Sequence, residues 1–259
     1  LIKANSIISS FKPDVVIGTG GYVCGPILMA AALRNIPTLI QEQNVIAGIT
    51  NKILSRFVDV VAVGYNEAAK SFDKAKQVVY TGNPVRPDVL VDSRVEGRKH
   101  FGLSDDIFTV LIAGGSRGAR TINNAMIDVH KHFQGKDGIK LIHITGNGEY
   151  TSVLEKLGIN DGSGLGESSL ILPYLHDMPK ALAATDLAVF RSGAIGLAEL
   201  AVRGIPSVLV PYPYAAEDHQ TYNARIFVQE GAAHMIVDKV LTSHDLIGEI
   251  EMFMANREL

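Results

Sequence analysis

Short apolar runs rich in β-branched residues alternate with amphipathic segments along nearly the whole chain. The runs predict buried strands, and the apolar spacing between most of them predicts helices. The predicted strands are Asp14–Gly18, Thr38–Gln41, Asp59–Val63, Gln77–Tyr80, Phe108–Ala113, Lys140–Thr145, Leu170–Leu172, Asp186–Phe190, Ser207–Val210 and Ala232–Val237. The predicted helices are Val23–Asn35, Ala47–Arg56, Ala119–Phe133, Glu149–Leu157, Asp177–Ala184, Ala194–Arg203, Asp218–Gln229 and Ser243–Met254. Continuous apolar strands alternating with helices are typical of parallel sheets covered on both faces, so we expect an α/β protein.

Two prolines interrupt this pattern after the fourth predicted strand. Pro84 and Pro87, followed by the polar stretch 88–99, predict a linker between two sheets. We therefore expect a first domain over residues 1–85 and a second over residues 86–259. Residues 1–12 have helix-like apolar spacing, whereas an α/β domain usually opens with a strand. We expect the first domain to lack its first βα units in this chain.

Composition excludes several classes of protein. The 259 residues are 47% hydrophobic, which is enough for a sizeable core. No apolar run reaches the roughly 18 residues of a membrane-spanning helix. Cys24 is the only cysteine, which excludes an internal disulfide framework. The eight histidines show no metal-ligand spacing and Asp-x-Asp does not occur, so we expect no metal ion.

The net charge is −3, and the charged residues are unevenly distributed along the chain. Residues 1–86 hold nine Lys and Arg against five Asp and Glu, whereas residues 87–259 hold fifteen against twenty-two. This asymmetry favours two domains with different neighbours, although solvated faces would produce it as well. An acidic balance with 7% aromatic residues gives nucleic-acid binding no support.

A glycine-rich turn follows the predicted strand Phe108–Ala113. Its sequence, Gly-Gly-Ser-Arg-Gly-Ala at 114–119, leads into a helix, and the free N–H groups of a helix start favour a phosphate. A tight turn that requires glycine would explain the same residues. The segment also matches the Gly-x-Ser-x-Gly elbow of α/β hydrolases, with Ser116 as nucleophile. The triad would then be completed by Asp186 or Asp218 and by His219 or His234.

A second helix start with small residues follows the predicted strand Asp186–Phe190. Ser192, Gly193 and Ala194 open this helix, whose N–H groups can hold a pyrophosphate. Glu199 lies further along the same helix, and its carboxylate can accept two hydrogen bonds from a ribose diol. A solvated helix residue would fit the spacing of Glu199 equally well.

Polar residues follow several other predicted strands. Gln220 and Asn223 lie near the start of a helix, and Gln220 offers a donor and an acceptor to sugar hydroxyls, whereas Asp218 is expected to cap this helix. In the first domain, residues 18–22 and 41–44 lie at the carboxyl ends of strands, where open α/β sheets bind ligands.

Six motifs in this order resemble one known family. They are Gly-Thr-Gly-Gly-Tyr at 18–22 with Pro26, Glu-Gln-Asn at 42–44, Gly-Asn-Pro-Val-Arg at 82–86, Gly-Gly-Ser-Arg-Gly-Ala at 114–119, Arg-Ser-Gly-Ala at 191–194 with Glu199, and Asp-His-Gln at 218–220 with Asn223 and Ala224. Over nearly the whole chain, they resemble glycosyltransferase family 28, the MurG-type bacterial N-acetylglucosaminyltransferases. The resemblance implies a GT-B fold of two Rossmann-like domains. It also implies inverting transfer of GlcNAc from UDP-GlcNAc to lipid I, which makes lipid II for peptidoglycan and cell-wall synthesis.

The resemblance also implies roles for individual residues. The implied substrate-binding residues are Asn44, Arg86, Ser116, Leu175, Ser192, Gly193, Ala194, Ile195, Gly196, Leu197, Ala198, Glu199, Gln220 and Asn223, with Gly20, Gly21 and Tyr22 on the acceptor side. Ser116 and the helix start at Ala194 would contact the diphosphate, and Glu199 the ribose. Leu175 would lie by the uracil, and Gln220 and Asn223 would face the GlcNAc hydroxyls. Arg86 would reach the donor from the hinge, and Asn44 would serve the acceptor.

The sequence departs from the family pattern in two respects. The family begins with a glycine-rich loop whose histidine is the favoured catalytic base, and this segment is not found here. The helix that crosses back to the first domain at the end of family members is also absent or cut short after Leu259. We therefore expect the chain as given to bind the donor and to be nearly inactive, and Glu42 is the remaining candidate base. A catalytically dead UDP-sugar-binding module stays open as an alternative.

The resemblance implies a peripheral enzyme at the cytoplasmic face of the bacterial cell membrane. The expected ligands are UDP-GlcNAc and polyprenyl-linked lipid I, with no cofactor, and other cell-wall synthesis proteins are possible partners. Basic residues of the first domain would attract an anionic membrane surface. The apolar residues Leu1, Ile2, Ile7 and Ile8 of the first predicted helix would add a hydrophobic patch, unless that helix packs wholly into the core.

Overall fold

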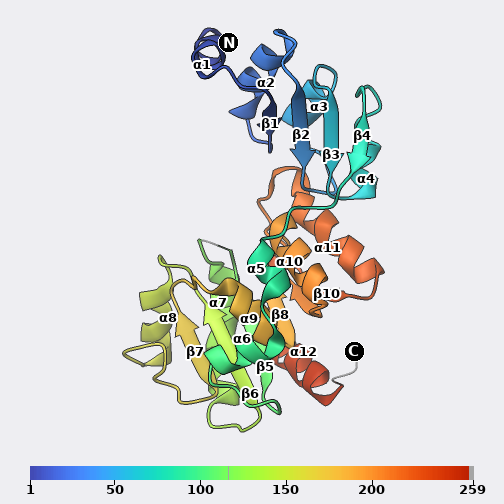
Figure 1. Ribbon diagram of the computed structural model, residues 1–259. Helices are drawn as coiled ribbons and strands as arrows, with labels where there is room; N and C mark the ends of the chain where they lie inside the picture. Colours follow the sequence, from blue (N-terminus) through green and yellow to red (C-terminus); the bar gives the residue numbers. More distant parts are fainter. Residues whose placement is uncertain (116, 257–259) are drawn as a thin grey trace. The chain divides into compact units, whose positions relative to one another are not determined.

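A computed structural model describes residues 1–115 and 117–256 of the chain (Figure 1). The chain forms two compact units. The first unit comprises Leu1–Pro84 and Tyr214–Asn223, and the second comprises Val85–Pro213 and the chain from Ala224 onward.

The first unit is built on a parallel sheet whose strands follow one another in chain order. Within the described residues the sheet has four strands, β1 (Val16–Gly18), β2 (Thr38–Glu42), β3 (Val60–Val63) and β4 (Val78–Tyr80). Its helices are α1 (Ile2–Phe11), α2 (Cys24–Ala32), α3 (Ile49–Leu54) and α4 (Asn66–Ala69). Leu28 of α2 and Leu54 of α3 pack with Ile40 and Val61 of the sheet, so helices close over the strands as the apolar runs require.

The second unit contains a larger parallel sheet, in the order β10-β9-β8-β5-β6-β7 across the part of the chain that is described (Figure 1). Its strands are β5 (Phe108–Ala113), β6 (Ile139–Ile144), β7 (Ser169–Leu172), β8 (Leu187–Phe190), β9 (Ser207–Leu209) and β10 (Ala233–Met235). The chain runs outward from β5 on one side and from β8 on the other. The strand order therefore reverses between β5 and β8, and open α/β sheets bind ligands at such a switch point.

Helices cover both faces of the larger sheet. Val110 and Ile112 of β5 pack against one face with residues of α7 and α12, whereas Leu111 and Ala113 pack against the other with α9 and α10. The helices that follow β5 are α7 (Arg120–Phe133), α8 (Tyr150–Leu157), α9 (Met178–Ala184), α10 (Ala194–Arg203), α11 (His219–Gln229) and α12 (Ser243–Ala255), with short 3-10 turns at Ala216–Asp218 and Asp238–Val240. All ten predicted strands are present, and the α/β prediction is confirmed.

The prediction of a linker over residues 88–99 is wrong. This stretch forms two helices, α5 (Pro87–Val91) and α6 (Arg94–His100), that belong to the second unit. Pro87 occupies the first turn of α5, where its missing N–H costs nothing. Ser93 and Glu96 form a capping box at the start of α6, and the Ser-x-x-Glu spacing could have indicated it.

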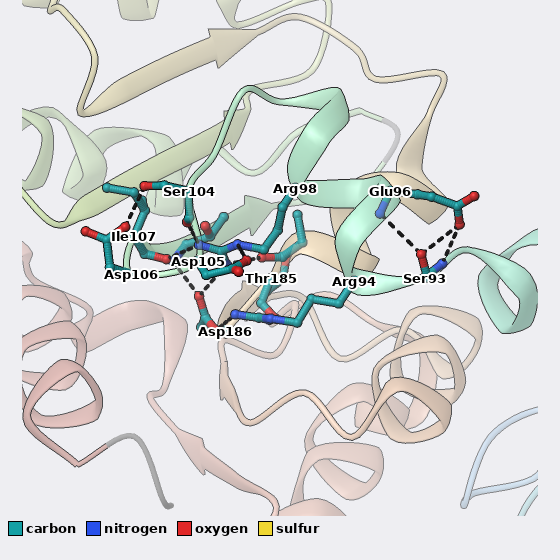
Figure 2. A network of polar contacts seen from close by, with 12 residues as sticks. Ser93, Arg94, Glu96, Arg98, Ser104, Asp105, Asp106, Ile107, Thr185 and Asp186 are labelled. Atoms are coloured by element: carbon teal, nitrogen blue, oxygen red, sulfur yellow. Dashed lines mark hydrogen bonds and ion pairs between the residues drawn. The ribbon is translucent and has the colours of Figure 1, made fainter.

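A buried arginine ties α6 to the sheet (Figure 2). Arg98 is 2% exposed, and its guanidinium donates to the carbonyls of Ser104 and Ile107. Its Nη1 lies 3.5 Å from Asp186, whose carboxylate also accepts from Arg94 at 2.5 Å and from the backbone N–H of Thr109 at 2.8 Å. Arg98 is thus buried and paired, whereas other polar residues of 88–99, such as Asp88, Glu96 and Lys99, are exposed on these two helices.

Candidate functional site

The turn after β5 depends on glycine. The N–H of Gly118 donates to the carbonyl of Gly115 at 2.9 Å, and both residues have positive φ, 76° and 88°. A Cβ on Gly118 would overlap the carbonyl oxygen of Thr145, so a side chain cannot be accommodated there. Ser116, the predicted phosphate contact, lies outside the described residues. The turn leads into α7 and so presents the open N–H groups of a helix start.

A second helix start follows β8, directly beside β5 in the sheet. Gly193 is the N-cap of α10, which begins at Ala194. Ser192, Ala194 and Leu197 are buried, and the side chain of Leu197 packs in the core, so this residue can offer a ligand only its backbone. Of the neighbouring helix residues, Gly196 and Ala198 are half-buried and Ile195 is more exposed. Two helix starts therefore lie at the switch point of the sheet.

Arg191 organises the loops around this point. It forms an ion pair with Asp238 at 2.5 Å, and both side chains are about nine-tenths buried. Its Nη1 donates to the carbonyls of Val210 and Pro211, each at 3.0 Å, where β9 ends. Asp238 also accepts from the hydroxyl of Thr121 in the first turn of α7. Sequence reasoning placed Arg191 in a motif but missed this role, because Asp238 lies 47 residues away in the chain.

Glu199 is buried and paired with a cation. Its Oε1 accepts from Nε of Arg86 at 2.8 Å, and the Glu199 side chain is 9% exposed whereas the Arg86 side chain is 49% exposed. The hydrogen bond that Arg86 donates to Glu199 raises the pKa of Arg86. Arg86 is the N-cap of α5, so the second unit opens with the partner of this carboxylate. Leu175, predicted beside the uracil, is half-buried against the core, next to the more exposed Tyr174.

Glu42 in the first unit is engaged on both oxygens. Oε1 accepts from the backbone N–H and the side-chain amide of Asn44 at 3.0 and 3.3 Å. Oε2 accepts from the N–H of Gly48 at 3.0 Å and from the amide of Asn51 at 2.8 Å. The residue is 2% exposed. A carboxylate held by four donors is suited to fixing the loop 43–51 rather than to taking a proton.

The amide of Asn223 is directed at the same loop, within the first unit. This residue is fully buried, its Oδ1 accepts from the N–H of Val45 at 2.9 Å, and its Nδ2 donates to Oδ1 of Asn44 at 3.0 Å. The predicted sugar contact Asn223 and the predicted acceptor residue Asn44 therefore bind each other here. Gln220 is half-buried one turn earlier in α11.

The predicted acceptor residues Gly20, Gly21 and Tyr22 form an open turn after β1. Gly20 and Gly21 have φ of 95° and 79°, which favours glycine, and Tyr22 is 87% exposed. Asp218, predicted to cap α11, lies directly before the helix and accepts a hydrogen bond from the Thr221 hydroxyl at 2.7 Å.

Two candidate members of the hydrolase triad, Asp186 and His234, lie away from the turn after β5 within the second unit. Asp186 precedes β8, four residues before Phe190, which is the register partner of Ala113. It therefore lies about 13 Å along the strand from the turn that holds Ser116. His234 is on β10, three strands from β5, and contacts Glu249 at 2.7 Å, while Nδ1 of His219 donates to the carbonyl of Ala216.

No helix among the described residues is both long and apolar enough to cross a membrane. No group of three or more His, Cys, Asp or Glu side chains in the same residues is placed to hold a metal ion.

Comparisons with known proteins agree with this geometry. Residues 109–259 match the glycosyltransferase family 28 C-terminal domain, and residues 1–63 match the glycosyltransferase family 28 N-terminal domain. The whole chain is 46% identical to a UDP-N-acetylglucosamine--N-acetylmuramyl-(pentapeptide) pyrophosphoryl-undecaprenol N-acetylglucosamine transferase of Thermoanaerobacter sp. (strain X514) and spans 70% of that relative. A protein of the same name from Desulfitobacterium hafniense (strain DSM 10664 / DCB-2) is 48% identical over 246 residues, which are 95% of this chain and 67% of the relative.

Solved structures give the same result. The crystal structure of Acinetobacter baumannii MurG superposes with a TM-score of 0.74 at 31% identity, over 99% of this chain and 70% of that one. A UDP co-structure of S. aureus MnaA, at 15% identity and a TM-score of 0.71 over 99% and 71% of the two chains, shares the fold alone.

These matches and the two parallel sheets define an α/β protein of the GT-B class, as predicted. The chain belongs to glycosyltransferase family 28. The comparisons give no support to a hydrolase or to a non-catalytic module.

Proposed function

We propose that this protein is an inverting N-acetylglucosaminyltransferase that moves GlcNAc from UDP-GlcNAc to the C4 hydroxyl of lipid I. The product would be lipid II, which serves peptidoglycan and cell-wall synthesis. The observation that carries the proposal is the pair of helix starts at the β5–β8 switch point, together with the buried Glu199 in the second helix. The names of relatives at 46% and 48% identity support the same reaction.

The donor would lie at the carboxyl ends of β5 and β8. The starts of α7 and α10 would hold the diphosphate, because open N–H groups and the positive end of a helix dipole attract an anion. Ser116 is assigned to the first of these starts and Ser192 to Ala198 to the second. Glu199 would accept from the ribose diol, since only its Oε1 is engaged by Arg86. Leu175 would offer backbone groups to the uracil, and Gln220 would contact the sugar.

The transfer itself would be a single displacement. A base removes the proton of the acceptor hydroxyl, the oxygen attacks the anomeric carbon, and the bond to UDP breaks with inversion. The dipole of α10 would stabilise the charge that develops on the departing diphosphate, a task that needs no metal in this proposal. We assign Glu42 to positioning rather than to proton transfer, because four donors occupy its oxygens.

The reaction is tested by transfer of labelled GlcNAc to lipid I in detergent. The full-length enzyme should form labelled lipid II, and the activity should survive EDTA. Absence of transfer would overturn the proposal, whereas loss of activity only with EDTA would overturn its metal-free part.

The ribose contact is tested by Glu199→Ala. Loss of a charged acceptor should weaken UDP binding by about 1–3 kcal/mol in calorimetric titration. Glu155→Ala is the matched control, since Glu155 is an exposed helix residue of the same unit. Equal UDP affinity of the two variants would contradict the assignment of Glu199.

We also propose that the first unit docks on an anionic membrane surface at the cytoplasmic face. The helix α1 does not pack wholly into the core: Leu1, Ile2, Ile7 and Phe11 are 63%, 90%, 47% and 79% exposed. Ile8, predicted in the patch, is instead buried against α2. The exposed Lys3 and Lys12 flank the apolar residues and would each contribute roughly 1 kcal/mol near anionic lipid.

Liposome co-sedimentation tests the docking surface. Binding should require anionic lipid, weaken as salt rises, and fall in Ile2→Ser and Phe11→Ser. Val240→Ser is the matched control, because Val240 is 63% exposed but lies in the second unit. Equal binding to neutral vesicles, or an equal loss in the control, would contradict the proposal.

A further inference from the structure

Two histidines are fully buried against each other in the second unit. His130 of α7 and His143 of β6 have no exposed surface, and Nε2 of His130 lies 3.1 Å from Nδ1 of His143. Their rings are nearly parallel, with centroids 5.3 Å apart. Burial lowers the pKa of His130 to about 4, and burial together with His130 lowers the pKa of His143 well below its ordinary value. Both imidazoles are therefore neutral at neutral pH.

The hydrogen bond that Asn123 donates determines which nitrogen of each imidazole carries the proton. Nδ2 of Asn123 donates to the carbonyl of Thr145 at 2.9 Å, so Oδ1 of Asn123 must be the acceptor toward His143. Nε2 of His143, 3.0 Å away, then carries the proton. A neutral imidazole has one donor and one acceptor, so Nδ1 of His143 accepts from Nε2 of His130.

This series of hydrogen bonds ends at Ser169 on the neighbouring strand β7. Nδ1 of His130 is left as an acceptor, and the hydroxyl of Ser169 lies 2.9 Å from it. The hydrogen bonds therefore run in one direction, from Ser169 through His130, His143 and Asn123 to the Thr145 carbonyl. Every side chain in this sequence is at least 99% buried, so water does not substitute for a missing link.

At its other end, the series of hydrogen bonds reaches the Thr145 carbonyl, which contacts the glycine turn after β5. The Thr145 carbonyl faces Gly118 so closely that a Cβ would overlap its oxygen, and Gly146 likewise packs against Arg117 and the N–H of Gly118. Asn123 also lies in the first turn of α7, whose start follows this turn. The buried hydrogen-bond series thus fixes two things: the Thr145 backbone that packs against Gly118, and the start of helix α7 that follows the turn.

We propose that His130 and His143 are positioning residues of the donor site, which hold the Gly118 backbone and the start of α7 in the arrangement that receives the diphosphate of UDP-GlcNAc. The inference rests on the proposed function, because that function places the diphosphate at this turn. Neither imidazole touches the donor: each acts through Asn123 and the Thr145 carbonyl. Two side chains that sequence reasoning passed over for lack of metal spacing thereby acquire a role in donor affinity.

The first test is the tautomeric state of the two rings. Long-range ¹H–¹⁵N correlation spectra of the wild-type protein should show His130 and His143 both protonated on Nε2 and unprotonated on Nδ1 near neutral pH. A proton on Nδ1 of either ring would overturn the hydrogen-bond direction and the proposal with it.

The second test separates positioning from folding. His143→Phe removes the link to Asn123 and should raise the KM for UDP-GlcNAc and the Kd for UDP on the order of tenfold, a loss that corresponds to one hydrogen bond. The KM for the lipid acceptor should stay unchanged. His143→Gln can still donate to Asn123 and should restore the KM for UDP-GlcNAc to within about threefold of wild type.

Leu141→Ala is the matched control. Leu141 is buried two residues earlier on the same strand and packs on the same face, but it lies outside the hydrogen-bond chain. Its truncation should lower the melting temperature and leave the KM for UDP-GlcNAc unchanged.

The outcomes distinguish the inference from the function on which it rests. A full-length wild-type enzyme without transferase activity would refute the proposed function. An active wild type whose His143→Phe variant keeps its KM, or whose Leu141→Ala variant shows the same rise in KM, would refute the positioning role. Should His143→Phe fail to fold, Ser169→Ala removes only the far end of the chain, and it should raise the KM two- to threefold; an unchanged KM would refute the role.

Discussion

Replacement of Glu42 by glutamine should release the loop 43–51 from the first sheet. The wild-type carboxylate accepts four hydrogen bonds, two on each oxygen, from Asn44, Gly48 and Asn51. The amide of glutamine has the same shape but presents two N–H donors in place of one oxygen. Whichever way it is oriented, that side faces two donors of the loop, so two of the four hydrogen bonds are lost.

The free-energy cost of this substitution can be worked out from the number of hydrogen bonds lost. A hydrogen bond to a charged group contributes roughly 1.5–3 kcal/mol, so two lost bonds correspond to about 3–6 kcal/mol. Relief from burying a charge offsets part of this loss, because an ionised carboxylate is costly to remove from water. We expect a net destabilisation of the loop of about 3 kcal/mol, which is on the order of a hundredfold in its opening equilibrium.

Amide hydrogen exchange measures this opening directly. The N–H groups of Asn44 and Gly48 donate to Glu42, so their exchange should accelerate on the order of a hundredfold in Glu42→Gln. Glu67→Gln is the matched control, because Glu67 is exposed on α4 in the same unit. Its effect should stay within about 0.5 kcal/mol.

A catalytic base would behave differently. Removal of a base would leave exchange at Asn44 and Gly48 unchanged, abolish turnover and allow partial rescue by added formate. That combination would refute the positioning role of Glu42.

Three further predictions concern the second unit. Arg98→Met should cost about 3–5 kcal/mol in denaturant unfolding, because the carbonyls of Ser104 and Ile107 lose their buried donor and Asp186 loses one of its two cations, whereas Arg94→Met, at a half-exposed site, should cost less than about 1 kcal/mol. The free energy of unfolding should fall as the pH drops from 6.5 toward 4, because His130 binds a proton in the unfolded chain but not in the folded protein, where its pKa is about 4. The full effect is about 3 kcal/mol. In His130→Gln, the unfolding curves at pH 7 and pH 5 should differ less than they do in the wild type. Gly118→Ala should abolish UDP binding in calorimetry, because the Cβ meets the Thr145 carbonyl and φ is 76°.

Local sequence determined the secondary structure because strand and helix signals are short-range. The β-branched runs at residues 108–113 and 187–190 are buried wherever they pair, and their apolar composition alone specifies them as strands. The same holds for Gly115 and Gly118 before α7, whose positive φ favours glycine. Residues 88–99 misled the prediction because most of their polar side chains are exposed on two short helices, while Arg98 is buried and paired with the distant Asp186.

Tertiary structure alone decided which of these elements become neighbours. The periodicity of β5 and β8 does not state that they pair, yet their adjacency brings the two helix starts to one switch point. The partners of the site residues are likewise remote: Arg86 and Glu199 are 113 residues apart, and Asn44 and Asn223 are 179 apart. A hydrogen bond needs a separation near 3 Å in space and sets no separation in sequence, so only the folded chain shows that these polar residues satisfy one another.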